Sequence, residues 1–282
     1  MQKLIEKLKA ILTITRPVNV VITFVSVVIA TIICLPTKIP ELYVLLAAFS
    51  AALTAASGNI INDIFDIEID KINRPLRPLP SGKITVKEAY TLYFVLLILS
   101  ISFSLIISYL AFVIVIISNL LLLLYAKYLK RIPLIGNITV AFLTGMVFIF
   151  GGVVVQNPSA AIIPATFALL VNLIREIVKD MQDFEGDEIN GIKTFPVKFG
   201  FQKSKFIILF ISLALILYTL YPFITQIYRI EYFIVVMIIV NPILVYCLKI
   251  LFQDHSLKNL NKISNLLKIS MVFGLIAIFL GV

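Results

Sequence analysis

The chain has 282 residues, of which 61% are hydrophobic and 14% charged, and its mean hydropathy is +1.08. Soluble domains carry about 25% charged residues, so this composition excludes an ordinary soluble protein. The formal net charge of +9 does not indicate nucleic-acid binding, because the basic residues are spread through short connections between apolar segments. The composition predicts an all-α polytopic membrane protein without a nucleic-acid partner.

Nine apolar segments reach the length of about 20 residues that a helix needs to cross a bilayer. They lie near residues 17–36, 41–62, 86–107, 109–127, 133–154, 158–178, 204–225, 231–251 and 263–282. The amphipathic N-terminal segment leads into a full-length span without a cleavage site, so we expect no removable signal peptide. The sequence therefore predicts nine transmembrane helices.

The basic residues orient these helices. All but two of the 24 Lys and Arg residues fall on one side of the predicted topology, and Lys38 and Arg229 are the exceptions. Positive residues accumulate on the cytoplasmic side of membrane proteins, which predicts a cytoplasmic N-terminus and an external C-terminus. We expect a multi-pass protein of the cell membrane.

An acidic segment follows the second predicted span and opens on the cytoplasm. It carries Asn62, Asp63, Asp66 and Asp70, and three of these are spaced four residues apart, so a helix would place them on one face. Charges at the edge of a membrane helix are costly and are usually functional. Carboxylate and amide oxygens without His or Cys favour Mg²⁺, which commonly bridges carboxylates to substrate phosphates.

A second acidic segment repeats the pattern after the sixth span. Asp180, Asp183 and Asp187 have the spacing of the first three aspartates, and residues 66–73 and 183–190 both have the pattern D-x-E-x-D-x-I-N. The repetition predicts two parallel four-helix repeats within one transmembrane domain. We place the repeats at about 1–130 and 131–252, an extra helix at about 263–282, and cytoplasmic cap loops at about 67–85 and 180–200.

The basic residues near these segments suit an anionic substrate. Two acidic faces brought together would repel, at about 4 kcal/mol for unit charges 4 Å apart at an effective dielectric of 20, unless cations lay between them. Mg²⁺ would relieve this repulsion and create a diphosphate site. The candidates for binding the substrate are Arg16, Asn19, Arg74, Arg77, Lys179 and Lys193. For Arg74 and Arg77, held in a proline-rich loop that could close over the site, the alternative is anchoring at the membrane surface.

The organic part of such a substrate would lie in the bundle or in lipid, which suits an isoprenyl chain. Ionisation of an allylic diphosphate needs its charge neutralised and its cation kept near aromatic faces. Phe65, Tyr125 and Tyr128 are placed at a suitable depth, although ordinary packing is the better explanation for each of them. A secondary transporter is the main alternative, but transporters concentrate their key charges near the bilayer midplane.

With these motifs, the chain resembles the UbiA superfamily of intramembrane prenyltransferases. The superfamily signature N-D-x-x-D-x-x-x-D is matched by Asn62, Asp63, Asp66 and Asp70, and Asn73-Arg74-Pro75 continues it. The second aspartate-rich motif is matched by Asp180, Asp183 and Asp187. Within the superfamily, both segments look most like the archaeal digeranylgeranylglyceryl phosphate synthases.

This resemblance implies Mg²⁺-dependent transfer of a geranylgeranyl group from its diphosphate to geranylgeranylglyceryl phosphate, in archaeal ether-lipid synthesis. The expected metal ligands are Asn62, Asp63, Asp66, Asp70, Asp180, Asp183 and Asp187, with Asp63 and Asp180 completing or orienting the shell. The expected catalytic residues are Asp66, Asp70, Asp183, Asp187 and Lys179. Related members use aromatic acceptors in quinone, haem or tetrapyrrole pathways, and this alternative stays open.

Overall fold

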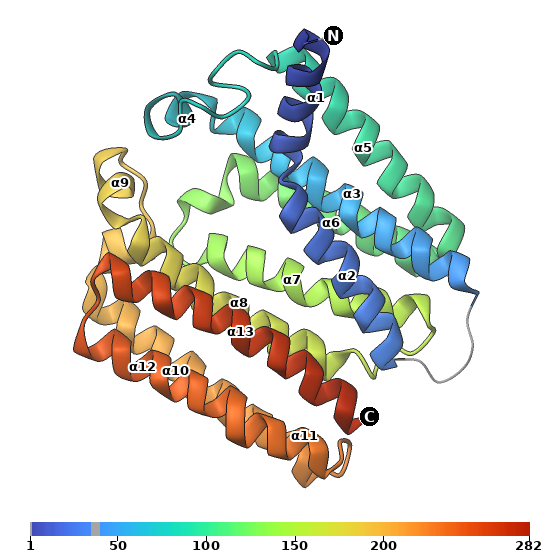
Figure 1. Cartoon of the computed structure of the whole chain (residues 1–282), viewed down its shortest axis with the longest axis vertical. Coiled ribbons are helices and arrows are strands. Elements are labelled where there is room, and N and C mark those ends of the chain that lie inside the picture. Colours follow the sequence, from blue (N-terminus) through green and yellow to red (C-terminus); the bar gives the residue numbers. More distant parts are fainter. Residues whose placement is uncertain (1, 35–39) are drawn as a thin grey trace. The chain divides into compact units, whose positions relative to one another are not determined.

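The computed structural model of the chain describes residues 2–34 and 40–282, with side chains for all of these except residues 2–4 and Asn73. Lys38, expected on the outer side, lies outside the described residues. Every regular element in the described part is a helix (Figure 1). Eight of these helices are long and apolar enough to cross a membrane. The prediction of an all-α polytopic membrane protein is confirmed.

The helices follow the chain in this order: α1 (Gln2–Thr15), α2 (Pro17–Cys34), α3 (Glu41–Phe65), α4 (Ile67–Asn73), α5 (Val86–Ile107), α6 (Tyr109–Lys127), the short 3-10 turn η1 (Leu129–Arg131), α7 (Ile135–Val154), α8 (Ile162–Gln182), α9 (Phe184–Ile189), α10 (Phe195–Ile224), α11 (Ile230–Val235), the π-helical turn η2 (Val236–Val240), α12 (Asn241–Gln253) and α13 (Leu257–Gly281). The segment α11-η2-α12 forms one of the eight membrane-length helices, Ile230–Gln253.

The remaining predicted span, 158–178, corresponds to α8. This helix is 21 residues long, but its last two turns carry Arg175, Glu176, Lys179 and Asp180. Because of these charges, α8 is not among the eight helices that are apolar enough to cross a membrane. The count of nine spans and the cytoplasmic N-terminus therefore stay predictions.

The described residues form two compact units, and each is described by itself. Unit 1 comprises residues 1–129 and 146–161, and unit 2 comprises residues 130–145 and 162–282. The first acidic segment belongs to unit 1 and the second to unit 2. The predicted repeats at about 1–130 and 131–252 stay a prediction.

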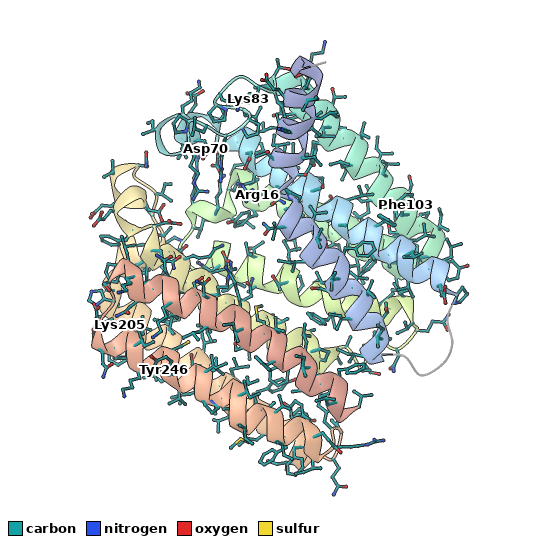
Figure 2. The ribbon with its side chains drawn as sticks, in the orientation of Figure 1. Arg16, Asp70, Lys83, Phe103, Lys205 and Tyr246 are labelled. Carbon is teal, nitrogen blue, oxygen red and sulfur yellow. The ribbon has the colours of Figure 1, made fainter. Side chains whose placement is uncertain are left out.

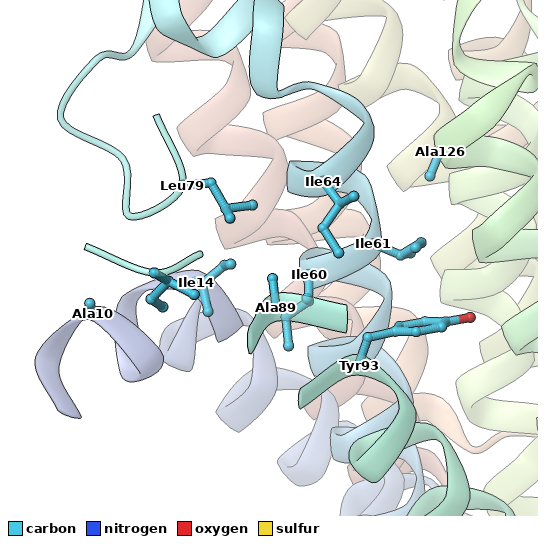
Figure 3. Packing of buried hydrophobic residues seen from close by; sticks show 10 residues of the cluster. Ala10, Ile14, Ile60, Ile61, Ile64, Leu79, Ala89, Tyr93 and Ala126 are labelled. Carbon is cyan, nitrogen blue, oxygen red and sulfur yellow. The ribbon is translucent and has the colours of Figure 1, made fainter. Parts of the chain in front are cut away.

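In unit 1, α3 packs against α2, α5 and α6. Small residues on α3 permit this close packing: a Cβ added to Gly58 would lie 2.8 Å from a methyl carbon of Leu122 on α6. The C-terminal end of α3 buries Ile60 and Ile64 against α1, α5 and the loop after α4 (Figure 3). Leu79 of that loop is part of the same buried cluster, so α1 and the loop are both fixed to the end of α3 that carries the first acidic segment.

In unit 2, α8 packs against α10 and α13. Its buried face includes Ile174, Ile177, Val178 and Met181, each at most 1% exposed. These residues occur every three or four positions, as expected of one helix face. Polar side chains of α8 bind α7, where Asn172 donates to Thr144 Oγ1 at 2.9 Å.

Candidate functional site

The first acidic segment spans a break between two helices. α3 ends at Phe65, and Asp66 has φ −97° and ψ 3° before α4 begins. The backbone hydrogen bonds continue across it, from Asp66 N to Asn62 O at 3.0 Å and from Asp70 N to Asp66 O at 2.8 Å. The side chain of Asn62 donates to Asp66 Oδ2 at 2.9 Å. This backbone geometry lies in a sparsely populated region where active-site residues are often found.

The second acidic segment has the same local geometry. α8 ends at Gln182, and Asp183 has φ −90° and ψ 6° before α9. Asp183 N donates to Lys179 O and Asp187 N to Asp183 O, both at 2.9 Å. The backbone therefore departs from regular helix at the middle aspartate of each set. In both units the helix is interrupted there and resumes as a short second helix.

Two arginines bind the first aspartate of unit 1. Asp63 is buried, and its Oδ1 accepts from Arg16 Nη2 at 2.5 Å and from Arg77 Nη1 at 3.4 Å. Arg77 Nη1 also donates to Asp70 Oδ2 at 2.6 Å. Arg16 and Asp70 lie at the end of unit 1 that α1, α3 and α4 share (Figure 2). The structure thus joins Arg16, Arg77, Asp63 and Asp70 in one ion-pair network.

The backbone around these arginines is tightly held. Arg16 joins α1 to α2 with a left-handed φ of 55°, and the Asn59 side chain donates to the preceding Thr15 O at 2.9 Å. Arg77 N donates to Arg74 O at 3.0 Å within the loop. Arg74 itself is exposed, as is Asn19 on the first turn of α2. Of the basic residues predicted in unit 1, Arg16 and Arg77 therefore contact the aspartates, whereas Arg74 extends into solvent.

In unit 2, a buried glutamate pairs with the predicted Lys179. Glu176 Oε1 accepts from Lys179 Nζ at 2.8 Å and from Arg175 Nη1 at 3.0 Å. One turn later, Asp180 Oδ2 accepts from the Asn137 side chain of α7 at 2.8 Å. Lys179 and Asp180 therefore each have a partner within their own unit.

The remaining carboxylates of unit 2 are more open. Asp183 is exposed and Asp187 is partly buried. Burial, together with repulsion from the Asp183 carboxylate, raises the pKa of Asp187 to about 6, while a hydrogen bond from Thr194 opposes the shift. Lys193, also predicted to bind substrate, is exposed. A cation bound near Asp183 and Asp187 would relieve their repulsion.

These donors fit Mg²⁺ completed by substrate oxygens. Both acidic segments offer oxygen donors only, which suits a hard cation. Among the described residues, no three His, Cys, Asp or Glu side chains converge to hold a metal by themselves. Mg²⁺ is typically held by one or two carboxylates and by substrate phosphates rather than by an all-protein cage. The arrangement therefore matches a metal that arrives with a phosphate-bearing substrate.

Comparison with protein families shows the family of the chain. The model of the UbiA prenyltransferase family matches residues 20–272. The chain belongs to the UbiA prenyltransferase family. It is therefore a multi-pass membrane prenyltransferase, as the two aspartate motifs predicted.

Individual UbiA relatives match over nearly their whole length. The digeranylgeranylglyceryl phosphate synthase of Methanocaldococcus jannaschii is 40% identical, covering 98% of this chain and 97% of its own. That of Methanobrevibacter smithii is 39% identical, covering 95% and 96%. A solved structure of a digeranylgeranylglyceryl phosphate synthase in membranes, 39% identical, covers 98% of both chains with a TM-score of 0.85. A UbiA homolog from Archaeoglobus fulgidus bound to GPP and Mg²⁺ shares the fold, with a TM-score of 0.68 at 19% identity over 95% of this chain and 99% of its own.

Three polar residues near the UbiA motifs were not among the predicted site residues. Arg175 and Glu176 contact each other next to Lys179, and Asn137 donates to Asp180. The signal for Glu176 was available, because a carboxylate inside an apolar helix is costly enough to indicate a role. Asn137 gave no comparable signal, since a single amide in an apolar segment is common.

Proposed function

We propose that the chain transfers a geranylgeranyl group from geranylgeranyl diphosphate to the free glycerol hydroxyl of geranylgeranylglyceryl phosphate. The main support is the near-complete match, at about 40% identity, to relatives named for this product. In this reaction the hydroxyl oxygen forms a bond to the allylic carbon, and the carbon–oxygen bond to the diphosphate breaks with its electrons leaving on the diphosphate. The hydroxyl proton passes to the departing diphosphate or to a carboxylate.

The acidic segments would hold the metal. Asn62, Asp66, Asp70, Asp183 and Asp187 are the proposed ligands, and Asp63 and Asp180 complete or orient the shell. When bound, Mg²⁺ would neutralise charge on the diphosphate and so favour its departure. The support is the identical spacing and the identical helix break at Asp66 and Asp183.

The basic residues would bind the anionic groups of the substrates. Arg16 and Arg77 contact the aspartates of unit 1, and Lys179, one residue before Asp180, pairs with Glu176. These positions favour contact with the diphosphate. Arg guanidinium groups donate paired hydrogen bonds to phosphate oxygens and hold them in a fixed orientation. Arg74 and Lys193 are exposed and suit the phosphate of the acceptor or the first encounter with substrate. Asn19, which is exposed on the first turn of α2, is a further proposed contact.

The reaction would take place at the cytoplasmic face of the cell membrane. The support is the concentration of Lys and Arg on the side where both acidic segments leave the membrane. Both lipid substrates can then keep their chains in the bilayer while their phosphates reach the polar segments.

Product analysis tests the acceptor. The purified protein is incubated with Mg²⁺ and geranylgeranyl diphosphate, together with either geranylgeranylglyceryl phosphate or 4-hydroxybenzoate, and the product is identified by its mass. We expect prenyl transfer to the glycerol phosphate only. Transfer to the aromatic acid alone would replace the proposal with the aromatic-acceptor alternative. Omission of Mg²⁺, with chelator present, should abolish product in either case.

A further inference from the structure

The first aspartate of each acidic segment is bound by a side chain from a distant part of the sequence of its own unit. In unit 1, Asp63 accepts from Arg16, which precedes α2. In unit 2, Asp180 accepts from Asn137, near the start of α7. The two aspartates occupy the same position in the repeated sequence pattern. A shared arrangement at equivalent positions indicates a shared role.

The contacts of Asp63 leave little room for a metal. Its side chain is 6% exposed, and one oxygen, Oδ1, accepts from both Arg16 and Arg77. A cation bound there would have to approach two guanidinium groups, and the repulsion would be strong in a partly buried site. A buried carboxylate with two arginine partners is instead well suited to hold those arginines in place.

Asp70 differs, because among the described residues its ion pair is formed with one arginine. Its side chain is 8% exposed, and Arg77 Nη1 lies 2.6 Å from Oδ2. If Mg²⁺ binds Asp70 through Oδ2, then Arg77 must leave this oxygen before the metal can bind. Leu79 and Ile84 hold the backbone of the loop in the buried cluster. The arginine side chain is long enough to leave Asp70 without a movement of this backbone.

We infer that Asp63 and Asp180 are positioning residues rather than metal ligands, and that Arg77 is an internal cation which Mg²⁺ displaces from Asp70. Displacement frees the guanidinium of Arg77 for the diphosphate, while Asp63 keeps it and Arg16 beside the site. The network then supplies a positive charge to Asp70 before the metal arrives and a phosphate contact afterwards. The inference rests on the proposed role of Asp70 in binding Mg²⁺.

Metal affinity tests the inference without any prenyl transfer. Mn²⁺ serves as the probe in place of Mg²⁺, and its binding to the full-length protein in detergent is measured from the loss of the free-ion electron paramagnetic resonance signal. The variants are Asp63→Asn, Asp180→Asn, Asp70→Asn and Arg77→Gln. Arg74→Gln is the matched control, since it removes the same charge from an exposed position of the same loop.

The expected results differ in direction between the variants. Asp70→Asn weakens Mn²⁺ binding by about tenfold or more, whereas Asp63→Asn and Asp180→Asn change it by less than about threefold. Arg77→Gln tightens binding by about fivefold, because Mn²⁺ no longer competes with a guanidinium, and Arg74→Gln changes it by less than about twofold. Loss of Mn²⁺ affinity in Asp63→Asn as large as in Asp70→Asn would overturn the positioning role. Unchanged or weaker affinity in Arg77→Gln, or equal tightening in Arg74→Gln, would overturn the exchange.

A second measurement separates positioning from general stability. Binding of inorganic pyrophosphate at saturating Mn²⁺ is followed by calorimetry. Asp63→Asn should weaken pyrophosphate binding by about tenfold while Mn²⁺ binding is retained, because Arg16 and Arg77 lose their anchor. Asp63→Glu, which keeps the carboxylate, should restore much of it. Unchanged pyrophosphate affinity in Asp63→Asn would refute the positioning role.

Two features keep these tests decisive. If Asp63→Asn does not fold, Asp180→Asn tests the positioning role in unit 2, and Arg77→Gln tests the exchange independently. Neither measurement contains an acceptor. A wrong assignment of the acceptor would therefore appear only in the product analysis, whereas a failure of this inference would appear only in binding.

Discussion

Replacing Glu176 by Ala should destabilise the protein far more than replacing Glu68 by Ala. Both glutamates pair with a lysine three residues later in the chain, Lys179 and Lys71, at 2.8 Å and 2.7 Å. The pairs differ in burial: the Glu176 side chain is 11% exposed and the Glu68 side chain 78%. The chain thus contains its own control for the effect of burial on an ion pair.

The magnitude follows from what each deletion leaves behind. Removal of one partner from a buried ion pair costs about 3–5 kcal/mol, because the other charge stays buried without compensation. Lys179 is 40% exposed and can turn toward water, but Arg175 is 21% exposed and would keep only a 3.5 Å contact with Asn172. We therefore expect a loss at the lower end, about 3 kcal/mol, for Glu176→Ala. Glu68→Ala should cost less than about 1 kcal/mol, as exposed pairs do.

Thermal unfolding in detergent, followed by far-ultraviolet circular dichroism, measures the difference. A loss of about 3 kcal/mol corresponds to a fall in melting temperature of roughly 6 °C or more for a chain of this size. Glu176→Gln keeps the side-chain volume and controls for a cavity, so it should lose most of the same stability. Equal melting temperatures for Glu176→Ala and Glu68→Ala would refute the argument that Glu176 compensates buried cations.

Three further predictions concern other parts of the chain. Gly281→Ala should cost about 1–3 kcal/mol by thermal unfolding, because its Cβ would lie 2.5 Å from a tyrosine Cβ of α11, whereas Gly274→Ala on the same helix has open space and should be neutral or stabilising. Hydrogen bonds from Ser256 lower the pKa of Asp254, so its contribution to stability is present above its ordinary pKa of 3.8 and is lost as the pH falls through the lowered value. Asp254→Asn should therefore lower the melting temperature at pH 7, and this difference should disappear at a pH below the lowered pKa. Asp183→Ala should abolish prenyl transfer while the circular dichroism spectrum stays that of the folded protein, and full activity would remove Asp183 from the proposed metal ligands.

Helix positions were predictable where apolar runs end at strong capping signals. The predicted spans 86–107 and 109–127 coincide with α5 and α6. Thr85 caps α5, accepting from Glu88 N, and Ser108 caps α6, accepting from Ala111 N. The span predicted at 204–225 lies in the part of α10 that follows a kink at Gly200 (φ 82°, ψ 164°), and a short helical segment that begins at Phe195 precedes the kink. The first turns of that helix carry lysines, so a search for apolar runs does not include them.

The residue types of the site were predictable, but their partners were not. The oxygen-only aspartate motifs and their spacing are visible in the sequence, and they led to the family that the comparison confirmed. The contacts of Asp63 with Arg16 and of Asp180 with Asn137 join residues 47 and 43 positions apart. Such pairs depend on how the helices pack. The break at Asp66 was also invisible, because no Gly or Pro marks it.

The buried charges of both units are better explained by orientation than by stability. A protein in which both partners of a buried ion pair are replaced by apolar residues of similar size is often equally stable or more stable. Folding alone therefore does not explain the pairs Glu176–Arg175 and Asp63–Arg16. A mobile lysine or arginine at a membrane edge would instead turn toward water and lipid headgroups. Pairing it with a buried carboxylate keeps it in one direction, at a cost that the surrounding helices must offset. Arg16 and Arg77 are oriented in this way by Asp63, whereas the exposed Arg74 is not. Substitution of Asp63 should therefore impair anion binding as strongly as substitution of either of its arginines.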